Sequence, residues 1–209
     1  GIDTLLRRQG RRDRFKLVFF NPSNEPGQRL GPTAVRRMLA RMRELDIETH
    51  LGHKPLRFEA DKVVTEGGEF GADLILFMPG LTGPAWLDDS ELPRSEGGFV
   101  AADAHCRAHG LEHVYVAGDI GSYPGPDWMA KQAHQADLQA GAVARNIAAT
   151  LRGQPANHGF KTELSCIVDS LDRGLLVYRS PSRTLTSPNL RLLHWLKHRF
   201  EARYLKAYR

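Results

Sequence analysis

A short apolar run bounded by turn residues restricts the fold of this chain more than any other feature. Residues 16–20 read Lys-Leu-Val-Phe-Phe and are followed directly by Asn21-Pro22. A continuous apolar run of this length is typical of a buried strand in a parallel sheet. Parallel strands need a crossover between them, most often a helix. We therefore predict an α/β fold.

The segments on either side of this run agree with that fold. Leu5 and Leu6 are followed by arginines around Gly10, which predicts a helix that ends at the glycine with cations in its last turn. Residues 32–45 begin with proline and carry apolar residues at helical spacing, as an amphipathic helix does. Residues 47–51 then return to the sheet. Helix, strand, helix and strand form an α/β unit.

The next part of the chain suggests a Rossmann-like domain that is incomplete. Residues 56–70 alternate like strands, with Gly67-Gly68 as a hairpin turn, and residues 73–78 predict another buried strand. A Rossmann unit also needs a first strand that runs into a Gly-rich turn, and G-x-G-x-x-G occurs nowhere in the sequence. We therefore expect only part of a Rossmann-like domain of the NAD-binding type.

A second region begins beyond a Pro- and Gly-rich crossing at residues 79–86. Strands are predicted at 98–101, 114–117, 164–168 and 175–178, a long Ala-rich helix at 128–151, and a final helix at 190–208. We predict three parts of the chain: a partial Rossmann-like second domain over residues 1–82, a second region of strands and a long helix over 83–185, and a final amphipathic helix over 186–209.

A glycine and an aspartate follow one of these strands. The run Val-Tyr-Val-Ala ends at Gly118-Asp119, which places a carboxylate where the chain leaves the sheet, with no side chain at Gly118 to obstruct a ligand. An ionised carboxylate accepts hydrogen bonds from sugar-like hydroxyls, and free N–H groups at the start of a following helix favour a phosphate. An ordinary strand-to-turn Gly-Asp would look the same.

The surrounding stretch favours the binding interpretation. Residues 98–103, a short spacer and residues 114–119 together resemble the second FAD signature of flavoproteins with two dinucleotide-binding domains. The resemblance implies that Asp119, next to Gly118, binds the ribityl chain, and that the amide of Ile120 faces the pyrophosphate of FAD. It also implies that residues 83–185 are the C-terminal part of an FAD-binding domain.

A cysteine motif narrows the family. Residues 158–174 contain Cys-Ile-Val-Asp-Ser-Leu-Asp-Arg-Gly from Cys166 to Gly174 and resemble the cysteine-bearing strand of sulfide:quinone oxidoreductases. The resemblance implies that Cys166 is one of two redox cysteines beside the flavin. A thiol is required because sulfide attacks a disulfide sulfur and a thiolate must leave. A lone cysteine on an apolar strand is otherwise an inert core residue.

Two further residues are interpreted through the same resemblance. Lys131 aligns with a lysine near the flavin, where a cation stabilises negative charge on reduced flavin, or it is a solvated helix residue. The family's other cysteine would precede Ile2, so it is missing here and we expect the isolated chain to be inactive. Cys106 matches no family cysteine and is interpreted as structural. No metal site is predicted.

The final helix combines apolar and basic residues. Its apolar stripe contains Leu193, Leu196, Phe200 and Tyr204. Around the stripe lie the aromatic residues Trp195 and Tyr208 and several cations, Arg209 among them. Basic amphipathic helices with aromatic residues bind anionic membrane surfaces, although a helix that covers its own core has a similar stripe. The resemblance implies membrane docking near quinone, so we expect residues 186–209 to be a membrane-association helix. The cations match no nucleic-acid recognition motif, so we expect no nucleic acid partner.

The composition of the whole chain limits its possible class further. The 209 residues carry 29 Lys and Arg against 24 Asp and Glu, and contain two cysteines, too few for a disulfide framework. No run is apolar over the ~18 residues of a spanning helix, and the first residues lack the order of a signal peptide, so we expect neither. We expect a peripheral or monotopic membrane protein. The chain starts without Met, so we expect a C-terminal fragment whose partner is the missing N-terminal half; homo-oligomerisation stays open.

The function that the sequence favours is therefore oxidation of sulfide through a redox cysteine and FAD, with electrons passed to membrane quinone. The first acid after the run at 16–20 is Glu25, beyond Asn21-Pro22, which argues against an adenosine ribose site for NADH. Alternatives are a type II NADH:quinone dehydrogenase, a flavocytochrome-type sulfide dehydrogenase, or a non-catalytic membrane-binding fragment.

Overall fold

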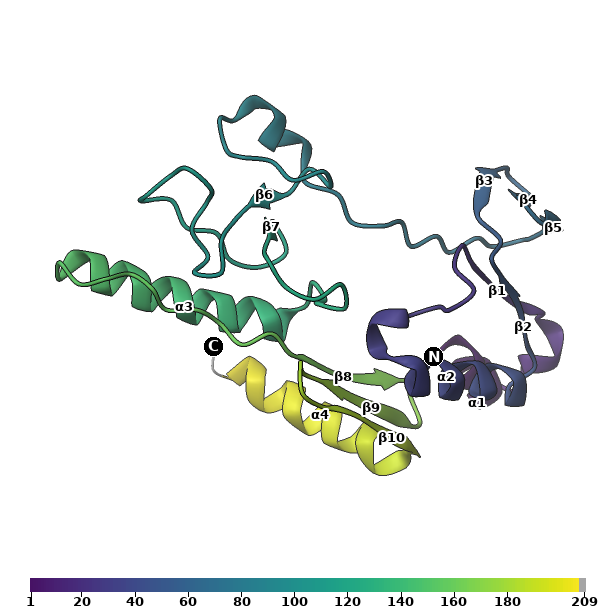
Figure 1. Cartoon of the computed structure of the whole chain (residues 1–209). Helices are drawn as coiled ribbons and strands as arrows, with labels where there is room; N and C mark the ends of the chain where they lie inside the picture. Colours follow the sequence, from purple (N-terminus) through teal and green to yellow (C-terminus); the bar gives the residue numbers. More distant parts are fainter. Residues whose placement is uncertain (207–209) are drawn as a thin grey trace. The chain divides into compact units, whose positions relative to one another are not determined.

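The computed structural model describes residues 1–206, which form two compact units (Figure 1). Unit 1 joins Gly1–Phe77 to the chain from Ser165 onward, and unit 2 contains Met78–Leu164. Unit 1 carries most of the regular structure. The three domain ranges expected from the sequence rest on family resemblance and stay predictions.

Unit 1 contains a parallel pair of strands joined by a helix. β1 (Leu17–Asn21) and β2 (Ile47–Leu51) pair in parallel, with Leu17 opposite Ile47, and α2 (Pro32–Glu44) forms the crossover and packs against β2. Proline at the first position of α2 suits the helix because its missing N–H would have no partner there. α1 (Ile2–Arg8) precedes the pair, and Gly10 follows it at φ +62°.

Two antiparallel sheets complete unit 1. β3 (Pro55–Phe58), β4 (Lys62–Thr65) and β5 (Gly68–Gly71) form a small meander. β8 (Leu164–Asp169), β9 (Gly174–Arg179) and β10 (Thr184–Leu190) form a second one, and α4 (Arg191–Lys206) packs against β9. Short 3₁₀ turns lie at Arg12–Arg14 and Gln28–Leu30. The predicted α/β fold is confirmed.

Unit 2 has little regular structure apart from one helix. A 3₁₀ turn at Ala85–Asp89 precedes β6 (Val100–Ala101), which pairs in parallel with β7 (Gly121–Ser122), and α3 (Ala133–Leu151) follows. Leu87, Val100, Ala102, Ala108 and Val116 form its hydrophobic cluster. Three buried amide side chains on α3 hold the irregular segments by hydrogen bonds: Gln135, Gln139 and Asn146.

Three predicted segments differ in the structure. Residues 73–78 form no strand, and Leu74, Leu76 and Met78 are exposed, because no described strand supplies hydrogen-bond partners there. β1 is half-buried rather than buried, since β2 is its only partner among residues 1–206. Residues 114–117 make a single bridge at Tyr115 instead of a strand.

The remaining differences concern element boundaries. The helix predicted at 128–151 begins at Ala133. β10 was not predicted, because its sequence Thr-Leu-Thr-Ser-Pro-Asn-Leu contains Pro188, and the strand accommodates the proline at a shift in register between Thr186 and Asn189. α4 confirms the final helix as far as Lys206. Tyr208, Arg209 and the end of the range 186–209 lie outside the described residues.

Candidate functional site

The turn after Tyr115 holds the residues that the sequence assigned to FAD. Gly118 has φ +83°, a left-handed conformation that glycine adopts without strain. Its N–H donates to the side-chain oxygen of Gln139 at 2.8 Å, and its carbonyl accepts the N–H of Gly121 at 3.1 Å. The carbonyl of Ile120 accepts the N–H of Val100 at 3.0 Å. The turn is therefore fixed by α3 on one side and by β6 on the other.

Asp119 lies at the exposed tip of this turn. Its backbone carbonyl accepts a hydrogen bond from Lys131, whereas its side chain is exposed. Among the described residues, no backbone carbonyl accepts the N–H of Ile120. An exposed carboxylate beside a free amide matches a ligand with hydroxyl and phosphate groups. The assignment of Gly118, Asp119 and Ile120 to FAD binding stays a prediction.

The helix expected directly after this turn is absent. The chain forms β7 after Ile120, and α3 begins only at Ala133. The expectation that a helix N-terminus adds its dipole to phosphate binding next to Asp119 is therefore wrong. The reason is that β6 recruits Gly121–Ser122 as its parallel partner, so this stretch becomes a strand.

Two hydrogen bonds tie Lys131 to the same turn, and its ammonium group also lies over the Phe99 ring. Its Nζ donates to the carbonyl of Asp119 at 2.7 Å and to that of Gly121 at 2.6 Å, and lies 3.8 Å from the centre of the Phe99 ring. The ammonium group thus sits beside Asp119 and positions the turn. It is not a freely solvated helix residue.

Cys166 belongs to the other unit, on β8. The side chain is half-buried, and Cys106 and Cys166 are both free thiols. Burial raises the pKa of Cys166, and the positive charge of Lys197 on α4 offsets only part of that effect. Because the pKa stays above its usual value, folding favours the neutral thiol over the thiolate that sulfur exchange requires. Cys106 is fully buried, with a pKa raised to about 12 by burial and by the charge of Asp103, which suits a structural residue.

The rest of the cysteine motif shapes the turn between β8 and β9. Asp169 accepts the N–H of Leu171 at 2.9 Å, and Asp172 accepts the hydroxyls of Ser170 at 2.8 Å and Thr4 at 3.3 Å. A Cβ on Gly174 would lie 3.1 Å from the backbone nitrogen of His194 and 3.0 Å from Cβ of Leu193. Glycine is needed there because α4 approaches the strand closely.

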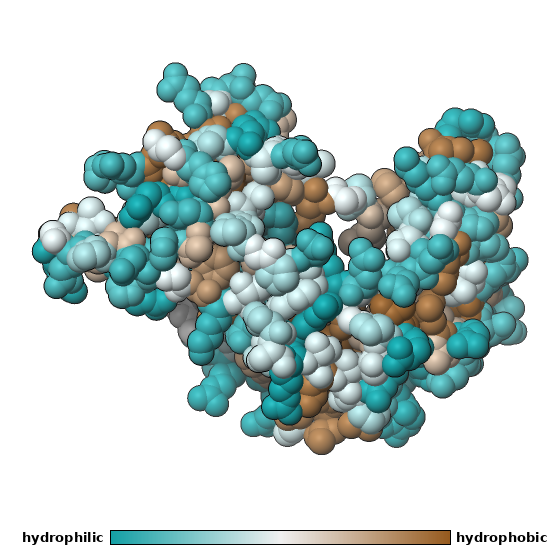
Figure 2. Space-filling view, in the orientation of Figure 1, coloured by the Kyte–Doolittle hydropathy of each residue, from teal (hydrophilic) through white to brown (hydrophobic). Residues whose placement is uncertain are grey.

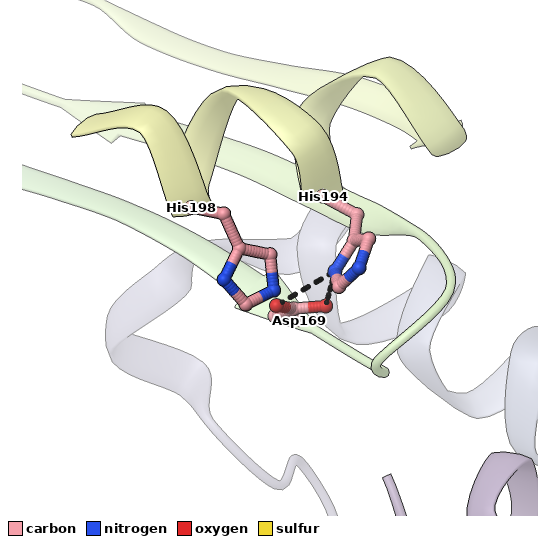
Figure 3. Close-up of side chains that lie close together, drawn as sticks. All are labelled: Asp169, His194 and His198. Atoms are coloured by element: carbon pink, nitrogen blue, oxygen red, sulfur yellow. Dashed lines mark hydrogen bonds and ion pairs between the residues drawn. The ribbon is translucent and has the colours of Figure 1, made fainter. Parts of the chain in front are cut away.

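Asp169 also binds α4, an interaction that the sequence analysis missed. Nδ1 of His194 lies 2.9 and 3.0 Å from its two carboxylate oxygens, and His198 lies one helical turn further on (Figure 3). Burial would raise the pKa of Asp169, but the hydrogen bonds from His194 and the Leu171 N–H, with the charges of His194 and Lys197, hold it below its usual value. The signal in the sequence was the His-x-x-x-His spacing.

α4 exposes part of its predicted stripe. Leu196 and Phe200 are exposed, whereas Leu193 and Tyr204 are half-buried against the unit. Figure 2 shows apolar residues that reach the surface between hydrophilic ones. The exposed apolar side chains of this helix are Leu192, Trp195, Leu196, Phe200 and Leu205. Within residues 1–206, no helix is both long and apolar enough to cross a bilayer.

Comparisons with known proteins agree on a family and a fold. Residues 19–140 match the family model of pyridine nucleotide-disulphide oxidoreductases. The structure is similar to that of the sulfide:quinone oxidoreductase from the hyperthermophilic bacterium Aquifex aeolicus, with a TM-score of 0.82 and 19% identity over 98% of this chain and 52% of that one. The chain thus spans about half the length of that relative.

Other solved structures share less of the fold. An NAD-dependent persulfide reductase from A. fulgidus has a TM-score of 0.60 at 15% identity, over 78% of this chain and 31% of that one. A water-forming NADH oxidase from Lactobacillus brevis has a TM-score of 0.59 at 13% identity, over 81% and 38%. No curated protein sequence matches the chain.

Proposed function

The chain belongs to the pyridine nucleotide-disulphide oxidoreductase family, and we propose that it is the C-terminal portion of an FAD-dependent sulfide:quinone oxidoreductase. The observation that carries the proposal is Cys166, a half-buried thiol on β8 that lies within the electrostatic influence of Lys197. A fold likeness over nearly the whole chain supports the same assignment. Sulfide is the electron donor in this proposal and membrane quinone the acceptor.

FAD fits the turn at Gly118 as far as this chain supplies the site. The carboxylate of Asp119 would accept hydrogen bonds from hydroxyl groups of the ribityl chain, and the N–H of Ile120 would donate a hydrogen bond to the pyrophosphate. Lys131 would keep both groups in place through its bonds to the carbonyls of Asp119 and Gly121. When bound, FAD supplies a two-electron acceptor for the thiol chemistry and a donor for quinone.

Cys166 would receive the sulfur. Hydrosulfide attacks a disulfide between Cys166 and a second cysteine, one S–S bond forms as the other breaks, and the second cysteine leaves as thiolate. Cys166 then carries a persulfide, and the charge of Lys197 favours the anionic sulfur that burial disfavours. The second cysteine would come from outside this chain, so the isolated chain is expected to be inactive.

α4 would attach the protein peripherally to a membrane. Its exposed apolar residues include Trp195 and Phe200, and Arg199 lies over the Trp195 ring at 5.0 Å. Aromatic and basic side chains together favour the headgroup region of an anionic bilayer. Flotation with anionic vesicles should carry the chain upward, and Phe200→Ser should reduce that fraction. Equal flotation of the variant would argue against α4 as the contact.

The test of the proposed function is a cysteine substitution in the complete enzyme. Cys166→Ser should abolish sulfide-dependent quinone reduction, because a hydroxyl forms no persulfide. Cys106→Ala is the matched control and should retain activity, since that thiol is fully buried. Full activity of Cys166→Ser would overturn the assignment.

A second candidate is an NADH-linked enzyme of the same family. It is favoured by the fold likeness to the NAD-dependent persulfide reductase and the NADH oxidase. Bleaching of the bound flavin by NADH but not by sulfide would select this candidate, including a type II NADH:quinone dehydrogenase. Reduction of a cytochrome but not of quinone would select a flavocytochrome-type sulfide dehydrogenase.

Flavin binding and membrane binding can be tested separately in the isolated chain. A visible absorption spectrum of the purified chain, with FAD added in excess and then removed, reports whether the turn at Asp119 holds flavin by itself. Retained flavin that is lost in Asp119→Ala supports the site. If no flavin is retained while vesicles still bind, the isolated chain is a non-catalytic membrane-binding module.

A further inference from the structure

Three potential metal ligands meet between β8 and α4 of unit 1. Asp169 lies at the end of β8, and His194 and His198 lie one turn apart on α4. Their ligand atoms, one from each side chain, all lie within 4.8 Å of one another. Figure 3 shows both imidazole rings turned toward the carboxylate of Asp169. The cluster thus combines two nitrogens and one oxygen from two elements.

The backbone brings this arrangement about in two ways. Residues four apart in a helix share a face, so His194 and His198 present their rings on the same side of α4. Gly174 on the neighbouring strand lets the backbone of α4 come close, because any Cβ there would meet the nitrogen of His194. The convergence is therefore a consequence of the helix packing.

The cluster is closed on one side and open on the other. The side chain of Asp169 is 8% exposed, that of His194 23% and that of His198 58%. A hydrogen-bonded His–Asp pair would need only His194. The second imidazole adds a third ligand on the solvent side, where a bound ion could also keep a water molecule.

We propose that Asp169, His194 and His198 bind a divalent transition-metal ion of the Zn²⁺ type. Two imidazoles and a carboxylate with an open fourth position form a ligand set that zinc takes in proteins. Magnesium and calcium prefer oxygen ligands, so these ions should bind poorly here. Metal bonds of about 2.0 Å in tetrahedral geometry place ligand atoms roughly 3.3 Å apart. The ligand atoms now lie within 4.8 Å of one another, so the side chains would rotate until those distances match the tetrahedral spacing. The metal would then replace the His194–Asp169 hydrogen bonds.

The surrounding groups support the ligands. Nδ1 of His198 lies 3.9 Å from a carboxylate oxygen of Glu201, so its other nitrogen is the one available to a metal. A carboxylate behind a metal-bound imidazole orients the ring and raises its basicity. Lys197 lies 4.0 Å from Asp169 and 3.5 Å from Glu201, so it can pair with Glu201 when a cation occupies the cluster.

Bound metal would cross-link β8 to α4. Three ligands from one strand and one helix would fix α4 against the sheet that carries Cys166. Since the unfolded chain holds no such cluster, metal binding adds directly to the stability of the folded unit. The inference does not depend on the proposed function, because it requires neither FAD nor sulfide.

Zinc titration of the full 209-residue chain tests the proposal. After treatment with EDTA, the chain should bind one equivalent of Zn²⁺ in competition with a chromogenic zinc chelator, and Mg²⁺ should not compete. His198→Gln should weaken binding by about tenfold or more. His113→Gln is the matched control, because His113 is exposed in unit 2 and should leave the affinity unchanged. Zn²⁺ should also raise the melting temperature of the chain but not that of His198→Gln.

The variants separate this cluster from other sources of zinc binding. Cys166→Ser should retain the affinity, because the thiol is not among the ligands. Equal binding by the chain and His198→Gln would overturn the proposal. The proposal would also be overturned if Cys166→Ser lost zinc binding while His198→Gln kept it. The same holds if the parent chain showed no saturable zinc binding.

Discussion

The two units of the molecule obtain their structure by different means. In unit 1, paired strands and the helices α2 and α4 are held by regular backbone hydrogen bonds. In unit 2, irregular segments are held by side chains of α3, and Asn146 alone makes three hydrogen bonds of 2.8 Å to the backbone of His105 and His158. Many backbone hydrogen bonds therefore share the stabilisation of unit 1, whereas a few buried side-chain amides carry much of it in unit 2.

The two cysteines follow the same contrast. Cys106 lies in unit 2 at φ +64°, with no exposed surface, and its Sγ faces the carbonyl of Gln139 at 3.9 Å. Cys166 lies on a strand of unit 1, half-buried and influenced by Lys197. A position enclosed by α3 and irregular loops protects one thiol, whereas the edge position of β8 leaves the other within reach of reagents.

The largest expected effect is the loss of Asn146. Asn146→Ala removes both donors and the acceptor and leaves buried backbone groups unpaired, which should lower the free energy of unfolding by about 3 kcal/mol. Urea denaturation measures this change, and hydrogen exchange should show the loss of protection within unit 2. Asn157→Ala is the control, because Asn157 is exposed, and it should change stability by less than about 0.5 kcal/mol. Similar midpoints for both variants would refute the role given to this amide.

A smaller effect is expected at Gly174 in unit 1. Gly174→Ala places a Cβ 2.7 Å from Cγ2 of Ile167 and 3.0 Å from Cβ of Leu193. The overpacking should cost about 2 kcal/mol, because α4 must move away from β9. Gly71→Ala is the matched control in the same unit, where the nearest atom would be 3.9 Å away. Equal stability of the two variants in thermal denaturation would show that α4 is not held closely.

The sequence predicted elements with a local pattern better than elements that depend on distant partners. Helices with regular apolar spacing, such as α2, and strands with apolar runs, such as β1, depend on local pattern. The turn at Gly118 depends on Gln139, which is distant in sequence, and no periodicity reveals that a glutamine will bind that backbone. Residues 73–78 have the composition of a strand, but a strand also needs a partner, and composition does not supply one.

The candidate site also combines residues predicted from local motifs with contacts that depend on tertiary packing. Gly118, Asp119 and Cys166 were predicted through motifs, and the structure supplies their surroundings. The His194–Asp169 contact was missed because it joins β8 to α4 through tertiary packing. The motif residues Asp172 and Gly174 serve the turn and the helix contact, which the resemblance by itself did not explain.

Alkaline pH should distinguish the protected thiol from the accessible one. The pKa of Cys106 is raised from 9.0 to about 12, chiefly by burial, with a further contribution from Asp103. A pKa raised by folding gives stability that is complete below the unfolded value of 9.0 and is lost as the pH rises through about 12. Between about pH 8 and about pH 10 this loss should be roughly 1 kcal/mol.

The comparison is made with Cys106→Ala, which lacks the titrating group at the same backbone position. Urea denaturation at both pH values should show a smaller decrease in stability for this variant than for the parent chain. Burial also raises the pKa of Tyr123, so part of the alkaline loss should remain in the variant. An identical pH dependence of the two proteins would contradict the protected state of Cys106.

The smallest effect concerns the electrostatics of Cys166. Burial raises the pKa of this thiol and Lys197 lowers it, so Lys197→Gln should reduce the thiolate fraction at neutral pH. Alkylation of Cys166 by iodoacetamide in the presence of EDTA, followed by mass spectrometry, should slow several-fold, because the thiolate is the reacting species. Arg199→Gln is the control, since Arg199 lies over the Trp195 ring and should not change the rate. An unchanged rate in Lys197→Gln would show that Lys197 does not set the reactivity of Cys166, and accessibility alone would then distinguish this thiol from Cys106.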